Sequence, residues 1–316
     1  MAVYTDVSFE DLERFLAAYA IGSALSFKGI AEGVENSNYF LKTERGVFVL
    51  TLYEKRVRAG DLPFFLGLME HLSARRIPCP LPVRGKDGAL FGTLCGRPAA
   101  VLTFLNGVSL SEPEPAHCAA AGAALAAIHD AGRDFAQTRP NALGPASWSE
   151  LAKRIGSRAD EIEPGLARLI AQGLDGLSFP ELPSGLIHAD LFADNVLFAG
   201  GEISGVIDFY FACTDAFAYD LAVLLNAWCF DAEGNFDLAR GKNLFAGYGT
   251  HRALTEAETA AMPMLARGAA LRFLLTRLYD LLHHDMRALV RPKDPREFAR
   301  RLRFHLGVRD ASEYGL

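Results

Sequence analysis

Apolar residues recur at helical spacing near the start of the chain. They follow Ser8, a residue type that often caps helices, and are Phe9, Leu12, Phe15, Leu16 and Tyr19. This spacing places them on one face of a helix, which we expect to end near Gly22.

The next segment is strand-like instead, and in its second run apolar residues occupy both faces, with Val47 and Val49 on one and Phe48, Leu50 and Leu52 on the other. Two β-prone runs at residues 38–43 and 47–54 are joined by a short polar link, Glu44-Arg45-Gly46, which predicts a hairpin. After it, Asp61 and Pro63 mark the start of a helix that should stop before Pro78.

A cluster of turn-forming residues at 106–107 and 111–115 marks the predicted domain boundary. An Ala-rich helix over 116–131 follows, and the remainder reads as mostly helical apart from strand-like sequence between 185 and 208. We therefore predict an α+β fold with two lobes, a small β-sheet lobe over 1–105 and a larger, mainly helical lobe over 106–316.

Composition narrows the class of protein. With 316 residues, 50% of them hydrophobic and 22% charged, the chain is long enough to bury a core without disulfides or a structural metal. Its 32 basic and 38 acidic residues give a net charge of −6, which argues against nucleic acid as a partner. The longest uncharged apolar run, 119–128, falls short of the roughly 18 residues of a membrane helix.

No signal peptide is visible in the acidic first twenty residues, so we expect a cytoplasmic protein without membrane contact. The five cysteines are scattered and include no C-x-x-C pair, which disfavours zinc and disulfide frameworks and fits a reducing compartment.

Candidate chemistry is concentrated in one segment, where an apolar strand ends and a polar loop begins. His188, Asp190 and Asn195 follow the spacing H-x-D-x-x-x-x-N, and the next strand ends in Asp208. A carboxylate that accepts a hydroxyl proton, together with amide and carboxylate oxygens that hold Mg²⁺, is what metal-assisted phosphoryl transfer requires. A structural alternative is that His188 and Asp190 only cap a turn, but the complete set favours the catalytic interpretation.

The sequence resembles the small-molecule kinases related to aminoglycoside phosphotransferases and choline kinases, and most closely the homoserine kinases of that protein-kinase-like fold. The resemblance covers nearly the whole chain. The segments that carry it are 33–41, 62–72, 188–198, 206–209, 219–222 and 267–280.

This resemblance implies a bilobal kinase that transfers the terminal phosphate of ATP to L-homoserine with Mg²⁺. Asp190 would deprotonate the acceptor hydroxyl, and Asn195 and Asp208 would hold the metal. His188 and Asp220 would brace the catalytic loop.

The resemblance also implies where the nucleotide binds. The loop over 32–38 would cover the phosphates, with Glu35, Asn36, Ser37 and Asn38 as candidate contacts. Residues 102–105 would connect the two lobes, and Thr103 and Leu105 would offer backbone groups to adenine.

The sequence departs from the family at the third strand. Thr51 stands where the family usually has a lysine that pairs with the phosphates, and the nearby cations Lys28, Lys55 and Arg56 are alternatives for its role or simply solvated. Without that lysine, Glu70 receives no role. Asp208-Phe209-Tyr210 is not D-F-G, and Ala189 replaces the arginine of protein kinases, which disfavours a protein substrate.

An amino-acid acceptor needs a partner for its carboxylate. Arg272 and Arg277 on a long apolar helix are the candidates, with structural pairing to acids such as Asp280 as the alternative. A quaternary ammonium acceptor would require an aromatic cage instead. The C-terminal stretch 287–309 is basic, with Arg296, Arg300, Arg301 and Arg303 on an expected helix, and we predict a solvated face there, with a partner site as the alternative. Two further functions remain open, a kinase for another alcohol and an inert nucleotide-binding module.

Overall fold

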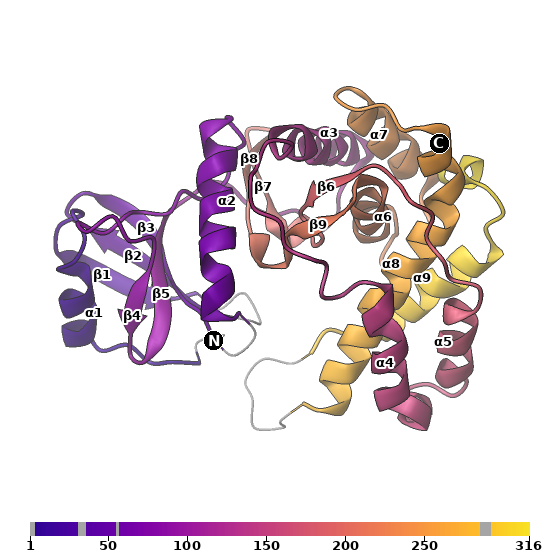
Figure 1. The fold of residues 1–316 in the computed structure, drawn as a ribbon, viewed down its shortest axis with the longest axis horizontal. Helices are drawn as coiled ribbons and strands as arrows, with labels where there is room; N and C mark the ends of the chain where they lie inside the picture. The colour runs from indigo at the N-terminus through magenta and orange to yellow at the C-terminus, as the bar shows by residue number, and fades with distance from the viewer. Residues whose placement is uncertain (1–3, 31–35, 55–56, 285–291) are drawn as a thin grey trace. The chain divides into compact units, whose positions relative to one another are not determined.

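The computed structural model describes residues 4–30, 36–54, 57–284 and 292–316 (Figure 1). The described residues form two compact units. The first holds the chain up to Gly107 together with Ser204–Tyr210, and the second holds Val108–Ile203 and the described residues from Phe211 onward. A strand-rich first part and a mainly helical second part confirm the predicted α+β class.

The first unit is built on an antiparallel five-stranded sheet in the order β1-β2-β3-β5-β4. The strands are β1 (Ala24–Gly29), β2 (Ser37–Thr43), β3 (Gly46–Leu52), β4 (Gly92–Leu94) and β5 (Arg97–Thr103). The predicted hairpin is the β2–β3 pair, closed at Thr43 opposite Gly46.

Alternation along the strands separates the two faces of this sheet. Leu41, Leu50 and Leu52 are fully buried in a core that α1 (Phe9–Leu16) also enters. On the other face, Phe40 lies opposite Val49, which in turn lies opposite Leu102 on β5. This second face carries Asn38 and Leu102, which belong to the two segments that the resemblance assigns to the nucleotide.

Helix α1 ends at Leu16 and not near Gly22 as predicted. The carbonyl groups of Ala17 and Ala18 accept hydrogen bonds from Lys86, from its ammonium and its backbone N–H respectively, both at 2.8 Å. These carbonyls are thus satisfied outside the helix, and the chain turns while Tyr19 still reaches the core.

The second helix of this unit, α2 (Leu62–Ala74), follows the short 3₁₀ turn η1 (Ala59–Asp61) and packs on the Ser204–Tyr210 segment. The rings of Phe65 and Tyr210 meet edge to face with centroids 5.7 Å apart. The backbone N–H of Val206 donates to the carbonyl of Pro78 at 2.7 Å. These contacts explain why a segment so late in the sequence belongs to the first unit.

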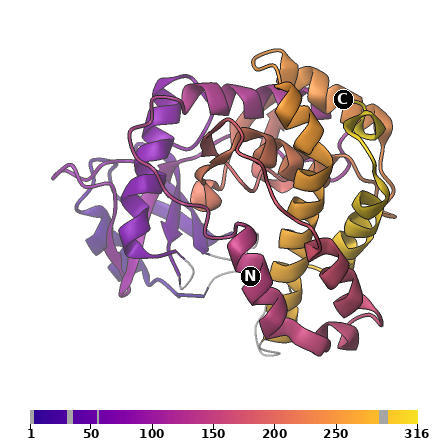
Figure 2. The ribbon, with the colours of Figure 1, turned by 45° about the vertical axis from the view of Figure 1, so that its right-hand side comes forward.

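Seven helices described in the second unit make up most of it (Figure 1). They are α3 (Pro115–Ala131), α4 (Pro145–Ile155), α5 (Leu166–Leu174), α6 (Phe217–Trp228), α7 (Leu238–Gly249), α8 (Glu256–Leu282) and α9 (Arg296–Gly307). The long α8, orange in Figure 2, packs against α4, α6 and α9. Helices α3 and α7 approach so closely that Gly122 and Gly247 have backbone atoms where a Cβ would stand.

Short strands in this part of the chain flank the catalytic segment. β6 (Ser184–Ile187) pairs antiparallel with β9 (Cys213–Ala216), and β7 (Val196–Ala199) pairs with β8 (Glu202–Val206). The turn η3 (Ala193–Asn195) precedes β7, so the H-x-D-x-x-x-x-N segment connects the end of one strand to the start of another.

The expectation of a solvated face on α9 is wrong at Arg301. Its side chain is buried, with the guanidinium 4.5 Å from the ring centroid of Phe298 and 5.3 Å from that of Phe230. Glu297, one turn earlier, accepts from it and supplies the opposite charge. None of the helices in the described residues is long and apolar enough to span a lipid bilayer.

Candidate active site

The catalytic segment begins where β6 ends in the buried Ile187. His188 is fully buried and Asp190 half-buried, and the short turn η3 brings Asn195 back toward Asp190. The side-chain Nδ2 of Asn195 donates to the backbone carbonyl of Asp190 at 2.8 Å and lies 3.5 Å from its carboxylate Oδ2. The structure thus brings together the candidate base and one candidate metal ligand.

Asp220, near the start of α6, holds the first turn of this loop. Its Oδ2 accepts the backbone N–H of His188 at 2.7 Å, and its Oδ1 accepts the backbone N–H of Ala189 at 2.8 Å. A buried carboxylate that receives two amides positions the backbone that leads to Asp190.

The ionisation of Asp220 also depends on its neighbours. Burial by itself would raise the pKa of this carboxyl, but the hydrogen bond and charge of His129, together with His188, lower the pKa below its usual value. Asp220 is therefore a carboxylate at neutral pH, which is the form that accepts from several donors at once.

The far end of the loop is held by the other end of α6. The indole Nε1 of Trp228 donates to the carbonyl of Leu191 at 2.9 Å, and the N–H of Asp190 donates to Nδ1 of His188 at 3.3 Å. The ring of His188 thus makes its hydrogen bond within the loop, and the bracing role that the resemblance implies for it stays a prediction.

Four residues that the sequence did not single out extend this network away from the loop. His129 on α3 contacts Asp220 at 3.0 Å through Nε2 and the hydroxyl of Tyr248 at 2.9 Å through Nδ1. Arg252 donates to the same hydroxyl at 3.2 Å and pairs with buried Glu258. His129 in this Ala-rich helix belongs to no motif or periodic pattern in the sequence, so only the fold reveals its contacts.

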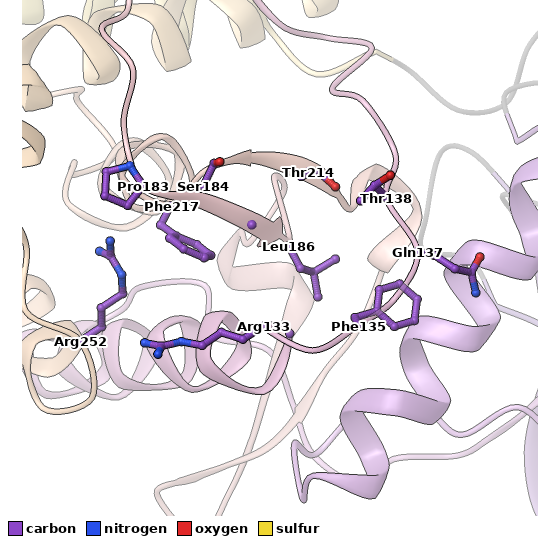
Figure 3. Close-up of a pocket in the computed structure, with 12 residues that line it drawn as sticks. Arg133, Phe135, Gln137, Thr138, Pro183, Ser184, Leu186, Thr214, Phe217 and Arg252 are labelled. Carbon is purple, nitrogen blue, oxygen red and sulfur yellow. The ribbon is translucent and has the colours of Figure 1, made fainter.

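Arg252 also lines a cavity of about 430 Å³ in the second unit (Figure 3). Its guanidinium lies 4.8 Å from the ring centroid of Phe217, and Ser184 and Leu186 of β6 form another wall. None of the candidate catalytic residues lines this cavity. It is therefore separate from the catalytic loop.

The remaining metal candidate, Asp208, belongs to the first unit. Its backbone has φ +65°, a left-handed conformation that a non-glycine residue adopts only at some cost. The buried hydroxyls of Tyr53 and Tyr210 lie 3.1 Å apart, and burial above all, with a contribution from the Asp208 charge, raises the pKa of both.

The first three candidates of the phosphate loop offer no free side chain that the structure describes. Glu35 lies outside the described residues. Ser37 is buried and donates to Glu54 at 2.8 Å, and the side-chain oxygen of Asn36 accepts from the backbone N–H of Glu54 at 3.3 Å. Both side chains are therefore engaged within the first unit.

Asn38 lies on the opposite sheet face from the core, beside the position of the missing lysine. The hydroxyl of Thr51 donates to its Oδ1 at 2.7 Å, so the amide Nδ2 is the group of Asn38 that remains for a ligand.

The alternatives for the lysine are placed only in part. Lys28 is exposed on β1, whereas Lys55 and Arg56 lie outside the described residues. Glu70 forms a two-point ion pair with Arg84, with distances of 2.8 and 2.6 Å. It therefore has a partner that the sequence did not indicate.

The expected adenine-binding segment follows β5. Thr103 exchanges hydrogen bonds with Leu81, accepting its N–H on Oγ1 and donating its own N–H to the carbonyl, both at 2.9 Å. Leu105 lies beyond the end of the strand and outside this exchange.

Both arginine candidates for the acceptor have internal partners. Arg272 is almost fully buried and donates through Nη1 to the carbonyl of Ala189. Arg277 pairs with Glu297 and lies 4.5 Å from the ring centroid of Phe298. Their role in acceptor binding stays a prediction.

Comparison with known proteins identifies the class. Residues 26–254 match the phosphotransferase enzyme family, and the chain belongs to that family. At the level of particular proteins, it is 60% identical over 318 residues to a homoserine kinase of Methylobacterium radiotolerans, covering 100% of this chain and 99% of the relative. A homoserine kinase of Chelativorans sp. is 57% identical over 319 residues, with 100% and 99% covered.

Solved structures of the same fold are more distant in sequence. A spectinomycin phosphotransferase in complex with ADP and spectinomycin has a TM-score of 0.68 at 15% identity, covering 96% of each chain. A microcompartment-associated aminopropanol kinase has a TM-score of 0.64 at 18% identity, covering 95% of each. At this identity the likeness concerns the fold alone, and it confirms the protein-kinase-like architecture.

Proposed function

We propose that this protein is an ATP-dependent homoserine kinase that forms O-phospho-L-homoserine. The observation that carries the choice of acceptor is the 55–60% identity, over the full chain, to proteins named homoserine kinase. The geometry of Asp190 and Asn195 supports the chemistry, because it combines a half-buried carboxylate with an amide that fixes its backbone.

Asp190 is the general base of the proposed reaction. It accepts the proton of the homoserine hydroxyl while the hydroxyl oxygen forms a bond to the γ-phosphorus of ATP and the bond to the β-phosphate oxygen breaks, which releases ADP. A carboxylate suits this role because the acceptor loses its proton as the new bond forms.

Mg²⁺ fits the donor set that the resemblance assigns to it. Asn195 uses its Nδ2 on Asp190, so its amide oxygen would be the group that ligates the ion, and Asp208 would supply a carboxylate, as the resemblance implies. When bound, the ion neutralises charge on the β- and γ-phosphates. The residues of the chain then have to hold those phosphates in line with the acceptor hydroxyl.

For the nucleotide, the sheet face opposite the core of the first unit offers an apolar row of Phe40, Val49 and Leu102. We assign adenine to this row, with backbone groups of residues 103–105 as its polar contacts. The Nδ2 of Asn38 is the proposed phosphate contact beside the position where the family has lysine.

An assay of ADP release with a panel of alcohols tests the proposal. Homoserine should be turned over faster than amino alcohols, sugars and aminoglycosides, and ³¹P NMR should show a phosphate monoester on its side-chain oxygen. Faster turnover of another alcohol would reject the acceptor. ATP binding without turnover of any alcohol would reject the enzyme and favour an inert nucleotide-binding module.

A further inference from the structure

Ala189, directly before the proposed base, has an unusual backbone. Its φ is +63°, in the left-handed region that alanine rarely occupies because its Cβ approaches the following carbonyl. The direction in which Asp190 leaves the loop depends on this torsion. Something must therefore hold Ala189 in a conformation that it does not favour.

Both peptide groups that flank Ala189 are held by buried charged side chains. On its amino side, the N–H of Ala189 donates to the carboxylate of Asp220 at 2.8 Å. On its carboxyl side, the carbonyl of Ala189 accepts from the guanidinium of Arg272 on α8. Fixing the two planes fixes φ and ψ of the residue between them.

The environment of Arg272 fits a role inside the protein. Its side chain is 2% exposed and contacts two rings, with the guanidinium 4.4 Å from the ring centroid of Phe273 and 5.4 Å from that of Phe211. This packing restricts the side chain before it meets the loop. Burial also strengthens a hydrogen bond from a charged donor to a carbonyl.

We propose that Arg272 is a positioning residue, which together with Asp220 clamps Ala189 in its left-handed conformation and so orients Asp190. Asp220 holds the amide side of the residue and Arg272 holds the carbonyl side. The inference rests on the proposed phosphoryl transfer at Asp190, but not on the identity of the acceptor alcohol.

A double-mutant cycle tests this clamp. Arg272→Met removes the donor and keeps a long, unbranched apolar side chain beside the two rings. Ala189→Gly removes the penalty of the left-handed conformation. Arg272→Met should lower kcat roughly 10- to 100-fold with little change in the KM of acceptor or ATP. In the Ala189→Gly background, the loss of kcat caused by Arg272→Met should be at least about threefold smaller, because glycine adopts the left-handed conformation without the steric penalty of a Cβ.

A control and a second variant make the result specific. Arg267 on the same helix donates to the carbonyl of Asp175, away from the loop, and Arg267→Met should keep the wild-type kcat. Arg272→Lys retains one charged donor and should recover part of the lost kcat. Thermal unfolding shows whether each variant is folded. If Arg272→Met does not fold, Arg272→Lys takes its place in the double-mutant cycle.

Two outcomes would overturn the inference. A raised KM for the acceptor with an unchanged kcat would make Arg272 a substrate contact. Equal costs of Arg272→Met in the wild-type and Ala189→Gly backgrounds would show that it does not act through this torsion. A wild-type protein without any kinase activity would instead refute the proposed function.

Discussion

The carboxylate of Asp220 and the backbone N–H of His188 are joined by a 2.7 Å hydrogen bond, and both residues are completely buried. The same carboxylate also receives the N–H of Ala189 and the ring of His129. The carboxylate of Asp220 on α6 therefore accepts three hydrogen bonds and connects α6 to the catalytic loop and to α3.

Replacing this charge should disturb both the loop and the fold. Asp220→Asn leaves one acceptor oxygen for three donors and places an amide NH₂ against another N–H. We expect the second unit to lose about 2–4 kcal/mol of stability, and kcat to fall at least roughly tenfold. Urea unfolding followed by the fluorescence of Trp148 and Trp228, both buried in the second unit, measures the first effect.

His129→Gln is the matched control for Asp220, because its terminal NH₂ still donates to the carboxylate. It should lose less stability than Asp220→Asn. Equal losses in the two variants would mean that the packing of this region matters and the charge does not.

Asp190 is expected to act in the chemical step and not in binding. Asp190→Asn keeps the size of the side chain but cannot accept the hydroxyl proton, so kcat should fall roughly 10²- to 10⁴-fold with ATP affinity nearly unchanged. Steady-state kinetics and nucleotide titration separate the two quantities. The control is Asp194→Asn on the same loop, since Asp194 forms an exposed ion pair with Lys293. A similar loss of kcat in this variant would argue against a special role for Asp190.

Asp208 is expected to set the response to Mg²⁺. Asp208→Asn replaces a charged ligand by a neutral one, so the concentration of Mg²⁺ for half-maximal activity should rise at least roughly tenfold. A titration of activity against MgCl₂ at saturating ATP measures it. An unaltered curve would remove Asp208 from the metal site.

The sequence predicts the architecture well because periodicity and turn residues act locally. The β2–β3 hairpin follows from two β-prone runs joined by a short polar link, and helix α2 from the proline near its start and its apolar spacing; the structure contains both. The exact end of α1 does not follow, because Lys86, about seventy residues later, satisfies the carbonyls that would continue it.

The sequence indicates the candidate catalytic residues, but not the residues from other helices that hydrogen-bond to the catalytic loop or to Asp220. His188, Asp190 and Asn195 stand out because a motif links residues that are close in sequence. His129, Trp228 and the carbonyl contact of Arg272 depend on helices far apart in the chain, which only tertiary packing brings to the loop.

Close contact between α3 and α7 predicts a steric effect on stability. A Cβ at Gly247 would lie 1.9 Å from the carbonyl oxygen of Ala119, a backbone atom that cannot move without shifting the helix. Gly247→Ala should therefore cost about 3 kcal/mol or more. Gly249 in the same helix has nothing within 4 Å of such a Cβ, so Gly249→Ala should be neutral or stabilising by up to about 1 kcal/mol. Tryptophan-monitored urea unfolding compares them, and equal effects would contradict the close packing.

His305 predicts how the stability of the second unit depends on pH. Burial, with a smaller effect of the Arg301 charge, lowers its pKa from 6.5 to about 3. Its Nε2 lies 3.0 Å from Oδ1 of Asn226, whose Nδ2 donates to two backbone carbonyls, so Nε2 carries the proton. Nδ1 then accepts from the hydroxyl of Tyr314 at 2.7 Å. The neutral ring is thus fully hydrogen-bonded, and a second proton would displace one of these partners.

The sign of the effect follows from this depressed pKa. Above about pH 6.5 the imidazole is neutral in both folded and unfolded chains and contributes no pH dependence. As the pH falls below 6.5, the unfolded chain binds a proton that the folded chain does not, so stability decreases until the pH reaches about 3. At pH 5 the loss should be roughly 2 kcal/mol relative to pH 7.5. His305→Gln, which cannot titrate, should show a smaller loss of stability by about that amount over the same interval, measured by urea unfolding at each pH. Parallel losses in the two proteins would mean that the imidazole takes up its proton in the folded state as readily as in the unfolded chain.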